Sequence, residues 1–164
     1  MSDQETKPTA KATKLTADAA VTLREVTSEN LQDILSLEVK PAQKKFVASN
    51  AVSIAEAHYE KKAWFRAIYA DETPVGFLML YDDPETTDYF LWRFMIDKRY
   101  QGMSFGRRAL KLLIKYVRNL PGATELLVSY YSADGSPEPF YTSLGFVHTG
   151  EVHDGEKVMR LMLQ

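Results

Sequence analysis

Hydrophobic and polar positions form short, regular patterns along the first half of the chain. Residues 21–26 alternate one by one, which is the period of a half-buried strand. Apolar residues then recur at helical spacing between residues 28 and 40, and again over 50–58 after the break at Pro41. Three strands are predicted next in succession, over residues 64–69, 75–81 and 89–96.

The second half switches between strands and helices. Apolar residues of 106–119 fall on one helical face, and Leu120-Pro121-Gly122 ends that helix. A strand over 125–130 and a short helix over 138–143 follow. Two strands, 146–150 and 157–163, complete the series. The order is βααβββαβαββ, which predicts an α/β (α+β) fold with a mixed sheet of about seven strands flanked by about four helices.

The same pattern predicts the domain organisation. Residues 1–18 are rich in Lys, Thr, Ala, Ser and Asp and have no periodicity, so we expect a disordered tail there. Residues 19–164 contain every predicted element, and a chain of 164 residues is the usual size of one domain. We therefore expect a single domain over 19–164.

Composition and charge exclude several function classes. The formal charge of −2 argues against nucleic acid, which normally needs a basic domain. The chain has no cysteine, which excludes disulfides and cysteine nucleophiles and fits a cytoplasmic location. Three scattered histidines give no metal-ligand spacing, so no metal site is expected. No apolar run approaches the length of a membrane span, so no membrane partner is expected either.

One stretch carries a chemical signal. The strand ending at Ile96 leads through a glycine-bearing loop, 101–106, into a helix, an arrangement that aims several backbone N–H groups at one point and binds anions. Arg107 and Arg108 then lie where the helix dipole disfavours cations. A bound phosphate would explain them, and a basic helix face in contact with solvent would explain them equally well.

Two motifs carry a resemblance to a known family. Gln101-Gly102-Met103-Ser104-Phe105-Gly106 resembles the Gln/Arg-x-x-Gly-x-Gly/Ala signature of the GCN5-related N-acetyltransferase (GNAT) superfamily. Phe140-Tyr141-Thr142-Ser143-Leu144-Gly145-Phe146 resembles its second, aromatic signature. The likeness covers nearly all of Val21 to Leu163. Within the superfamily the chain looks most like bacterial spermine/spermidine (diamine) acetyltransferases, on three segments: 43–47, 93–102 and 150–159.

The resemblance implies an acetyl-CoA site and an acid. Tyr141 would protonate the leaving thiolate, because a tyrosine with an ordinary pKa is protonated at neutral pH. The pantetheine arm would pair with the backbone of the fourth strand, and the phosphates would lie on the loop. The implied cofactor residues are Phe94, Met95, Ile96, Gln101, Gly102, Met103, Ser104, Phe105, Gly106 and Arg107.

The chain departs from the family pattern in three places. Ser104 stands where the signature has glycine, so the loop must either avoid a positive φ there or accept strain. Trp92 stands where relatives often carry a carboxylate near the reaction centre. Ala133-Asp134-Gly135 replaces the usual asparagine before the second motif.

The acceptor is expected to be a small-molecule amine. Such amines are cations at neutral pH, so carboxylates would hold them. We name as candidates residues of the acidic loop and of the segments that wall the acceptor site in relatives: Glu25, Glu38, Glu56, Glu85 and Asp88. An acidic loop that merely faces solvent is an equal alternative for any one of them. Arg93 on the fourth strand would repel a polycation, so it should pair with an acid or point away.

The leading hypothesis is an acetyl-CoA-dependent N-acetyltransferase that modifies a primary amine, with polyamines such as spermidine and spermine first, by direct attack in a ternary complex. Acetylation of a protein N-terminus, of lysine or of an aminoglycoside is a second hypothesis. A non-catalytic acetyl-CoA-binding regulatory domain is a third, motivated by Ser104, Trp92 and the missing asparagine. A homodimer is expected by analogy with the superfamily alone.

Overall fold

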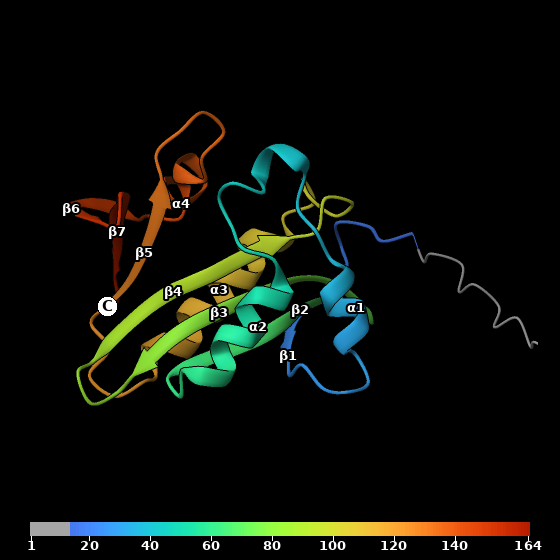
Figure 1. Ribbon diagram of the computed structural model, residues 1–164, viewed down its shortest axis with the longest axis horizontal. Helices are drawn as coiled ribbons and strands as arrows, with labels where there is room; N and C mark the ends of the chain where they lie inside the picture. Colours follow the sequence, from blue (N-terminus) through green and yellow to red (C-terminus); the bar gives the residue numbers. More distant parts are fainter. Residues whose placement is uncertain (1–13) are drawn as a thin grey trace, which may run out of the picture.

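A computed structural model describes residues 14–164 and places them in one seven-stranded sheet with helices on both faces (Figure 1). The strand order is β1-β2-β3-β4-β5-β7-β6. The predicted element order is confirmed, with one short 3-10 helix added. The elements are β1 (Val21–Arg24), α1 (Leu31–Ser36), η1 (Pro41–Gln43), α2 (Asn50–Tyr59), β2 (Ala63–Ala70), β3 (Thr73–Asp83), β4 (Asp88–Ile96), α3 (Phe105–Arg118), β5 (Glu125–Tyr131), α4 (Glu138–Ser143), β6 (Val147–His153) and β7 (Glu156–Met162).

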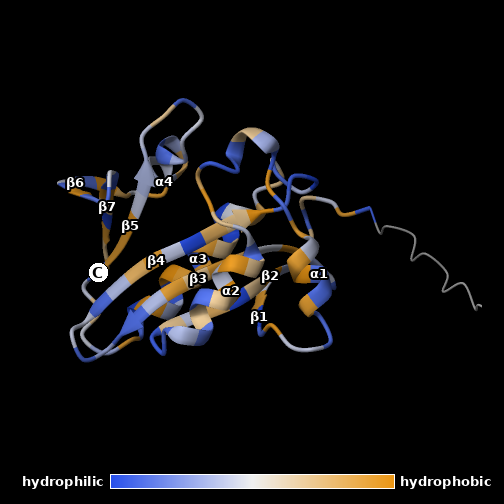
Figure 2. Ribbon diagram, viewed as in Figure 1, coloured by the Kyte–Doolittle hydropathy of each residue, from blue (hydrophilic) through white to orange (hydrophobic). Residues whose placement is uncertain are grey.

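The sheet buries a different apolar cluster on each face. On one face α3 lies along the sheet and buries Leu110 and Leu113 against Leu78 of β3. On the other face α1 and α2 cover Phe77 and Met95, with Ile34 of α1 fully buried. In Figure 2 the hydrophobic positions of β3 and β4 run along the strands beneath these helices. The apolar stripes on the helices therefore fix the two layers around the sheet.

The N-terminal boundary differs from the prediction. Residues 1–13 of the predicted tail lie outside the described residues. Residues 14–18, the rest of it, pack on the domain: Leu15 contacts the α3-side cluster, and Arg108 of α3 donates to Ala17 O and Ala19 O, both at 2.7 Å. The boundary at residue 19 is therefore too late, because bonds to backbone carbonyls leave no trace in a hydropathy pattern.

The sheet opens between β4 and β5, which is the feature that positions the site. These two parallel strands pair only at Phe90 with Leu127 and at Leu91 with Val128. One residue later β4 bulges: Leu91 faces Leu80 of β3, Arg93 faces Met79, and Trp92 has no partner between them. A bulge adds twist and bends its strand, so β4 leaves β5 at this point (Figure 1).

Candidate active site

A cavity of about 1100 Å³ occupies the opening between β4 and β5. Its walls include β4 from Phe90 to Ile96, the loop and first turn of α3, and residues 128–130 of β5. Segment 43–48, α4 and the turn between β6 and β7 complete it. Beyond Leu91, β4 has no strand partner on its β5 side within residues 14–164. The cavity therefore exposes a free sheet edge, whose N–H and C=O groups need partners.

The structure brings together most of the predicted cofactor residues. Met103 is the exception, since its side chain packs on the α3-side core cluster. The predicted residues that line the cavity are Phe94, Met95, Ile96, Gln101, Gly102, Ser104, Phe105, Gly106, Arg107 and Tyr141.

The glycine loop has the geometry of an anion site. Gly102 has φ +80° and needs glycine's freedom. Gly106 lets the first turn of α3 pack closely on Phe94, because a Cβ at position 106 would lie only 3.1 Å from Phe94 Cζ. The first amide of this helix to donate to the backbone is that of Arg108, to Ser104 O at 3.1 Å. The amides of the turn before it therefore point outward without helical partners.

Ser104 has a positive φ, the strained one of the two alternatives that the sequence leaves open. It is the N-cap of α3 with φ +64° and ψ +13°, the left-handed region, and its side chain makes no capping hydrogen bond. A left-handed non-glycine residue costs about 1 kcal/mol or more. The superfamily's glycine would fill this position without that cost. The Ser104 hydroxyl remains exposed at the cavity wall.

The two arginines of the first turn have protein partners. Arg107 Nη1 lies 3.0 Å from Ser143 Oγ and its Nη2 lies 3.2 Å from Ser143 O, so Arg107 joins α3 to the end of α4. Arg108 binds the N-terminal carbonyls described above. Carbonyls and a hydroxyl thus account for these cations without a phosphate. A phosphate contact for Arg107, which also lines the cavity, stays a prediction.

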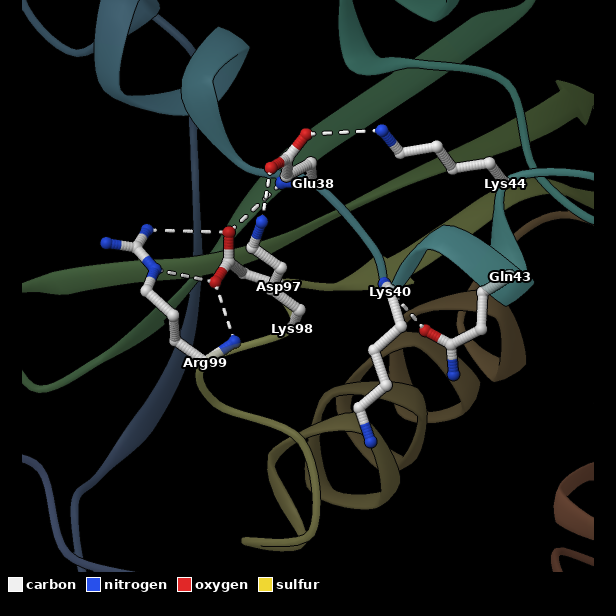
Figure 3. A network of polar contacts seen from close by, with 7 residues as sticks. All are labelled: Glu38, Lys40, Gln43, Lys44, Asp97, Lys98 and Arg99. Atoms are coloured by element: carbon white, nitrogen blue, oxygen red, sulfur yellow. Dashed lines mark hydrogen bonds and ion pairs between the residues drawn. The ribbon is translucent and has the colours of Figure 1, made fainter.

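A polar network ties segment 38–48 to the loop (Figure 3). Asp97, only 1% exposed, accepts from Glu38 N at 3.0 Å and from Arg99 N and Nε at 2.9 and 2.8 Å. Nearby, the side-chain amides of Gln43 and Gln101 donate to each other at 3.1 and 2.8 Å. Burial raises the pKa of Asp97, but the hydrogen bonds from Arg99 and Glu38 outweigh it and leave this pKa below its ordinary value.

Tyr141 lies on the opposite wall and is 5% exposed. Its ring packs on Phe140 and Phe146, with centroids 5.6 Å apart in both pairs. Across the described residues, the one buried side-chain nitrogen or oxygen without a partner is Arg93 Nε. The Tyr141 hydroxyl makes no hydrogen bond within residues 14–164, yet it is not among the buried atoms without a partner. Its oxygen is therefore not fully buried and is reachable from the cavity that Tyr141 lines. Burial, and secondarily the charge of Glu156, raise the pKa of Tyr141.

The structure does not bring the predicted acceptor carboxylates into this cavity. Glu25 lines a separate depression, where its Oε1 lies 3.9 Å from Arg66 Nη2. Glu38 pairs with Lys44 and Lys98, and Lys98 holds the pKa of Glu38 low. Glu85 and Asp88 are exposed on the β3–β4 turn, before the point where the strands separate. This part of the sequence prediction is unsupported, because distance along the chain does not reveal which carboxylates already have cation partners.

Glu56 meets Arg93 instead. Arg93 Nη2 lies 3.2 Å from Glu56 Oε2, which confirms that Arg93 pairs with an acid. Arg93 still lines the cavity, with its guanidinium carbon 5.5 Å from the centre of the Trp92 ring. Glu56 therefore neutralises a cation beside the cavity rather than facing into it.

Sequence reasoning missed Glu156 and Asp154. Both line the cavity from the β6–β7 hairpin. Ser129 Oγ of β5 lies 3.5 Å from Glu156 Oε2. Register puts Glu156 opposite Tyr131, the last residue of β5. The sequence signal that could have identified Glu156 and Asp154 is the resemblance of segment 150–159 to the diamine acetyltransferases. That resemblance points to the segment but assigns no role to any residue in it.

Comparisons with known proteins show which family and which relatives the chain is similar to. Residues 28–146 match the acetyltransferase (GNAT) family. The chain is 32% identical, over 150 residues, to a spermine/spermidine N(1)-acetyltransferase of Bacillus subtilis, an alignment that covers 85% of this chain and 97% of that protein.

Solved structures share the fold at lower identity. A domain from Methanocaldococcus jannaschii aligns with a TM-score of 0.72 at 17% identity, over 89% of this chain and all of that one. A Bacillus subtilis acetyltransferase solved in complex with CoA aligns with a TM-score of 0.64 at 14% identity, over 89% of this chain and 99% of that one. No helix within residues 14–164 is long and apolar enough to span a membrane.

Proposed function

This chain belongs to the acetyltransferase (GNAT) family and is an N-acetyltransferase, and we propose that it moves an acetyl group from acetyl-CoA to a primary amine of a polyamine such as spermidine or spermine. One observation carries the proposal. The opening between β4 and β5 has a free sheet edge and outward amides on one wall and the reachable hydroxyl of buried Tyr141 on the other.

The β4 side of the cavity suits the donor. Acetyl-CoA supplies the acetyl group as a thioester. Outward amides at Phe105 and Gly106, helped by the helix N-terminus, suit its pyrophosphate. Lys44 and Lys45 line the same wall and add positive charge. Within residues 14–164 the β4 edge from Phe94 to Ile96 has no strand partner on this side and suits the amides of the pantetheine arm, as one more strand would, although Ile96 O already accepts from Gln101 Nε2 at 3.0 Å.

Tyr141 suits the role of general acid. The neutral amine attacks the thioester carbonyl carbon, the C–S bond breaks, and the thiolate takes the proton of the Tyr141 hydroxyl. The amine nitrogen releases one proton to solvent after its attack, and Tyr141 takes one proton back from solvent. Because burial raises the pKa of Tyr141, its hydroxyl holds its proton through the physiological pH range. Direct attack is proposed because the chain has no cysteine to carry an acyl group.

Two features favour a polyamine as acceptor. The 32% identical relative is a spermine/spermidine acetyltransferase. The β5 side of the cavity also presents two carboxylates, Asp154 and Glu156, while the nearby cation Arg93 is held by Glu56. Negative charge on the acceptor side favours a cationic amine.

An acceptor panel tests the proposal. We expect acetyl-CoA-dependent release of CoA thiol with spermidine and spermine, at a kcat/KM at least 10-fold above that with a lysine peptide, a protein N-terminal peptide or an aminoglycoside. Preference for one of those three would replace the polyamine. Tight CoA binding without thiol release for any amine would identify a non-catalytic domain.

A further inference from the structure

We infer that Glu156 is the residue that binds an ammonium group of the acceptor and so makes this cavity selective for cationic amines. The inference rests on the proposed function and deepens it. It assigns acceptor recognition to the β6–β7 hairpin rather than to the acidic loop between β3 and β4.

Position is the first argument. Glu156 begins β7, which is hydrogen-bonded to β5 along its whole length, so its backbone is fixed by the sheet. Its carboxylate lines the cavity and is close enough to Tyr141 for its charge to act on that hydroxyl. A group bound at Glu156 therefore lies in the same cavity as the hydroxyl proposed to give the proton.

Availability is the second argument. No Lys, Arg or His within residues 14–164 forms an ion pair with Glu156, and its one side-chain hydrogen bond there is the long one from Ser129 Oγ at 3.5 Å. Of the other carboxylates near the cavity, Glu38 and Glu56 each have a cation within 3.5 Å, and Asp154 is exposed to solvent on the hairpin turn, whereas Glu156 is half-buried. A half-buried carboxylate without a countercharge keeps its capacity to bind a cation.

Charge balance is the third argument. The β4-side wall carries Lys44, Lys45 and Arg107. An ammonium ion is repelled there and attracted to Glu156, so the field of the cavity separates the phosphates of the donor from the cationic acceptor. Neutral acceptors gain nothing from this arrangement, which is why Glu156 would govern selectivity.

Titration calorimetry of spermidine into the full-length enzyme saturated with CoA tests the assignment. We expect Glu156→Gln to weaken spermidine binding at least 10-fold and to leave CoA affinity within 2-fold. Glu125→Gln is the matched control, because Glu125 is also a half-buried carboxylate of the β5–β7 pair that forms no ion pair within residues 14–164, loses the same charge and does not line the cavity. It should change spermidine affinity by less than 2-fold.

Turnover supplies a second readout. In Glu156→Gln, the KM for spermidine should rise at least 10-fold while kcat stays within 3-fold, and the KM for a weakly basic amine that is uncharged at neutral pH should not rise. Equal spermidine affinity in the wild type and Glu156→Gln, with normal acetylation, would overturn the inference and leave the proposed function standing. A wild type that acetylates no amine would overturn the proposed function itself.

Discussion

The two walls of the cavity are built from different interactions. The β4-side wall, which comprises the second half of β4, loop 97–104 and segment 38–48, is held by polar bonds between segments about sixty residues apart, such as Gln43 to Gln101. The β5-side wall, which comprises β5, α4 and the β6–β7 hairpin, holds Tyr141 by aromatic packing. The walls touch where Phe94 stacks on Phe140, with ring centroids 5.7 Å apart.

The difference suits the two chemical tasks. Phosphate recognition needs donors held in place before the ligand arrives, and the network around Asp97 supplies that rigidity. Proton donation needs a hydroxyl that keeps its proton and has no competing acceptor. Apolar packing gives Tyr141 both properties. Substitutions on the β5-side wall should therefore chiefly lower kcat, and substitutions on the β4-side wall should chiefly lower the free energy of unfolding.

The largest effect is expected at Tyr141. Tyr141→Phe keeps the ring packing and removes the proton donor, so kcat should fall about 10²–10⁴-fold, the usual contribution of a general acid. CoA affinity, measured by calorimetry, should stay within 2-fold. Wild-type kcat should show no alkaline loss below about pH 10, because the pKa of Tyr141 is raised. Tyr131→Phe, an exposed position on β5, is the control and should retain full turnover.

A loss of stability is expected on the other wall. Asp97→Asn loses the buried charge that accepts from Glu38 N and Arg99, so urea unfolding should show a loss of about 1–3 kcal/mol. Glu72→Gln breaks a similar contact to Arg24 that is exposed to solvent, and should cost less than about 0.5 kcal/mol. Equal losses in the two variants would contradict the role given to the Asp97 network.

The pH dependence of that loss has a definite sign. The pKa of Asp97 is lower in the folded protein than in the unfolded chain. Its contribution is therefore fully present above the unfolded pKa near 4 and disappears as the pH falls below it. The difference in unfolding free energy between wild type and Asp97→Asn should shrink on acidification.

Much of the fold could be predicted because it rests on local pattern. The strands and the apolar stripe of α3 follow from residue spacing, and the loop Gln101–Gly106 follows from its glycines. The acceptor side could not be predicted this way. Whether Glu38 or Glu56 is available depends on cations that only the folded chain brings near, Lys98 and Arg93. The bulge at Trp92 is equally invisible, since it is a property of pairing with β3.

A smaller effect separates two roles of Arg107. If Arg107 chiefly joins α3 to α4, Ser143→Ala should lower the unfolding free energy by about 0.5–1.5 kcal/mol for each of the two hydrogen bonds it removes, the one Ser143 Oγ accepts from Arg107 and the one it donates to Phe140 O. The KM for acetyl-CoA should be unchanged in this variant. Arg107→Ala should show the same loss and, if Arg107 also meets a phosphate, a higher KM for acetyl-CoA. A Ser143→Ala variant as stable as the wild type would contradict the role of Arg107 in joining α3 to α4.

The smallest effect is expected at Ser104. Because this residue holds a left-handed conformation at φ +64°, Ser104→Gly should raise the unfolding free energy by about 0.5–1 kcal/mol. Gly102→Ala, at φ +80° with open space around its Cα, should lower it by a similar amount. Thermal unfolding of both variants measures this. Destabilisation by Ser104→Gly would show that the serine side chain contributes more than its backbone costs.

The most direct measurement follows the acetyl group itself. The enzyme is mixed with acetyl-CoA labelled with ¹³C in the acetyl group and with spermidine, and both small molecules and intact protein are read by mass spectrometry. Direct transfer between the two walls predicts label on spermidine, one acetyl group per CoA released, and unmodified protein at every time point. Label that appears first on the protein, or CoA release without acetylspermidine, would contradict it.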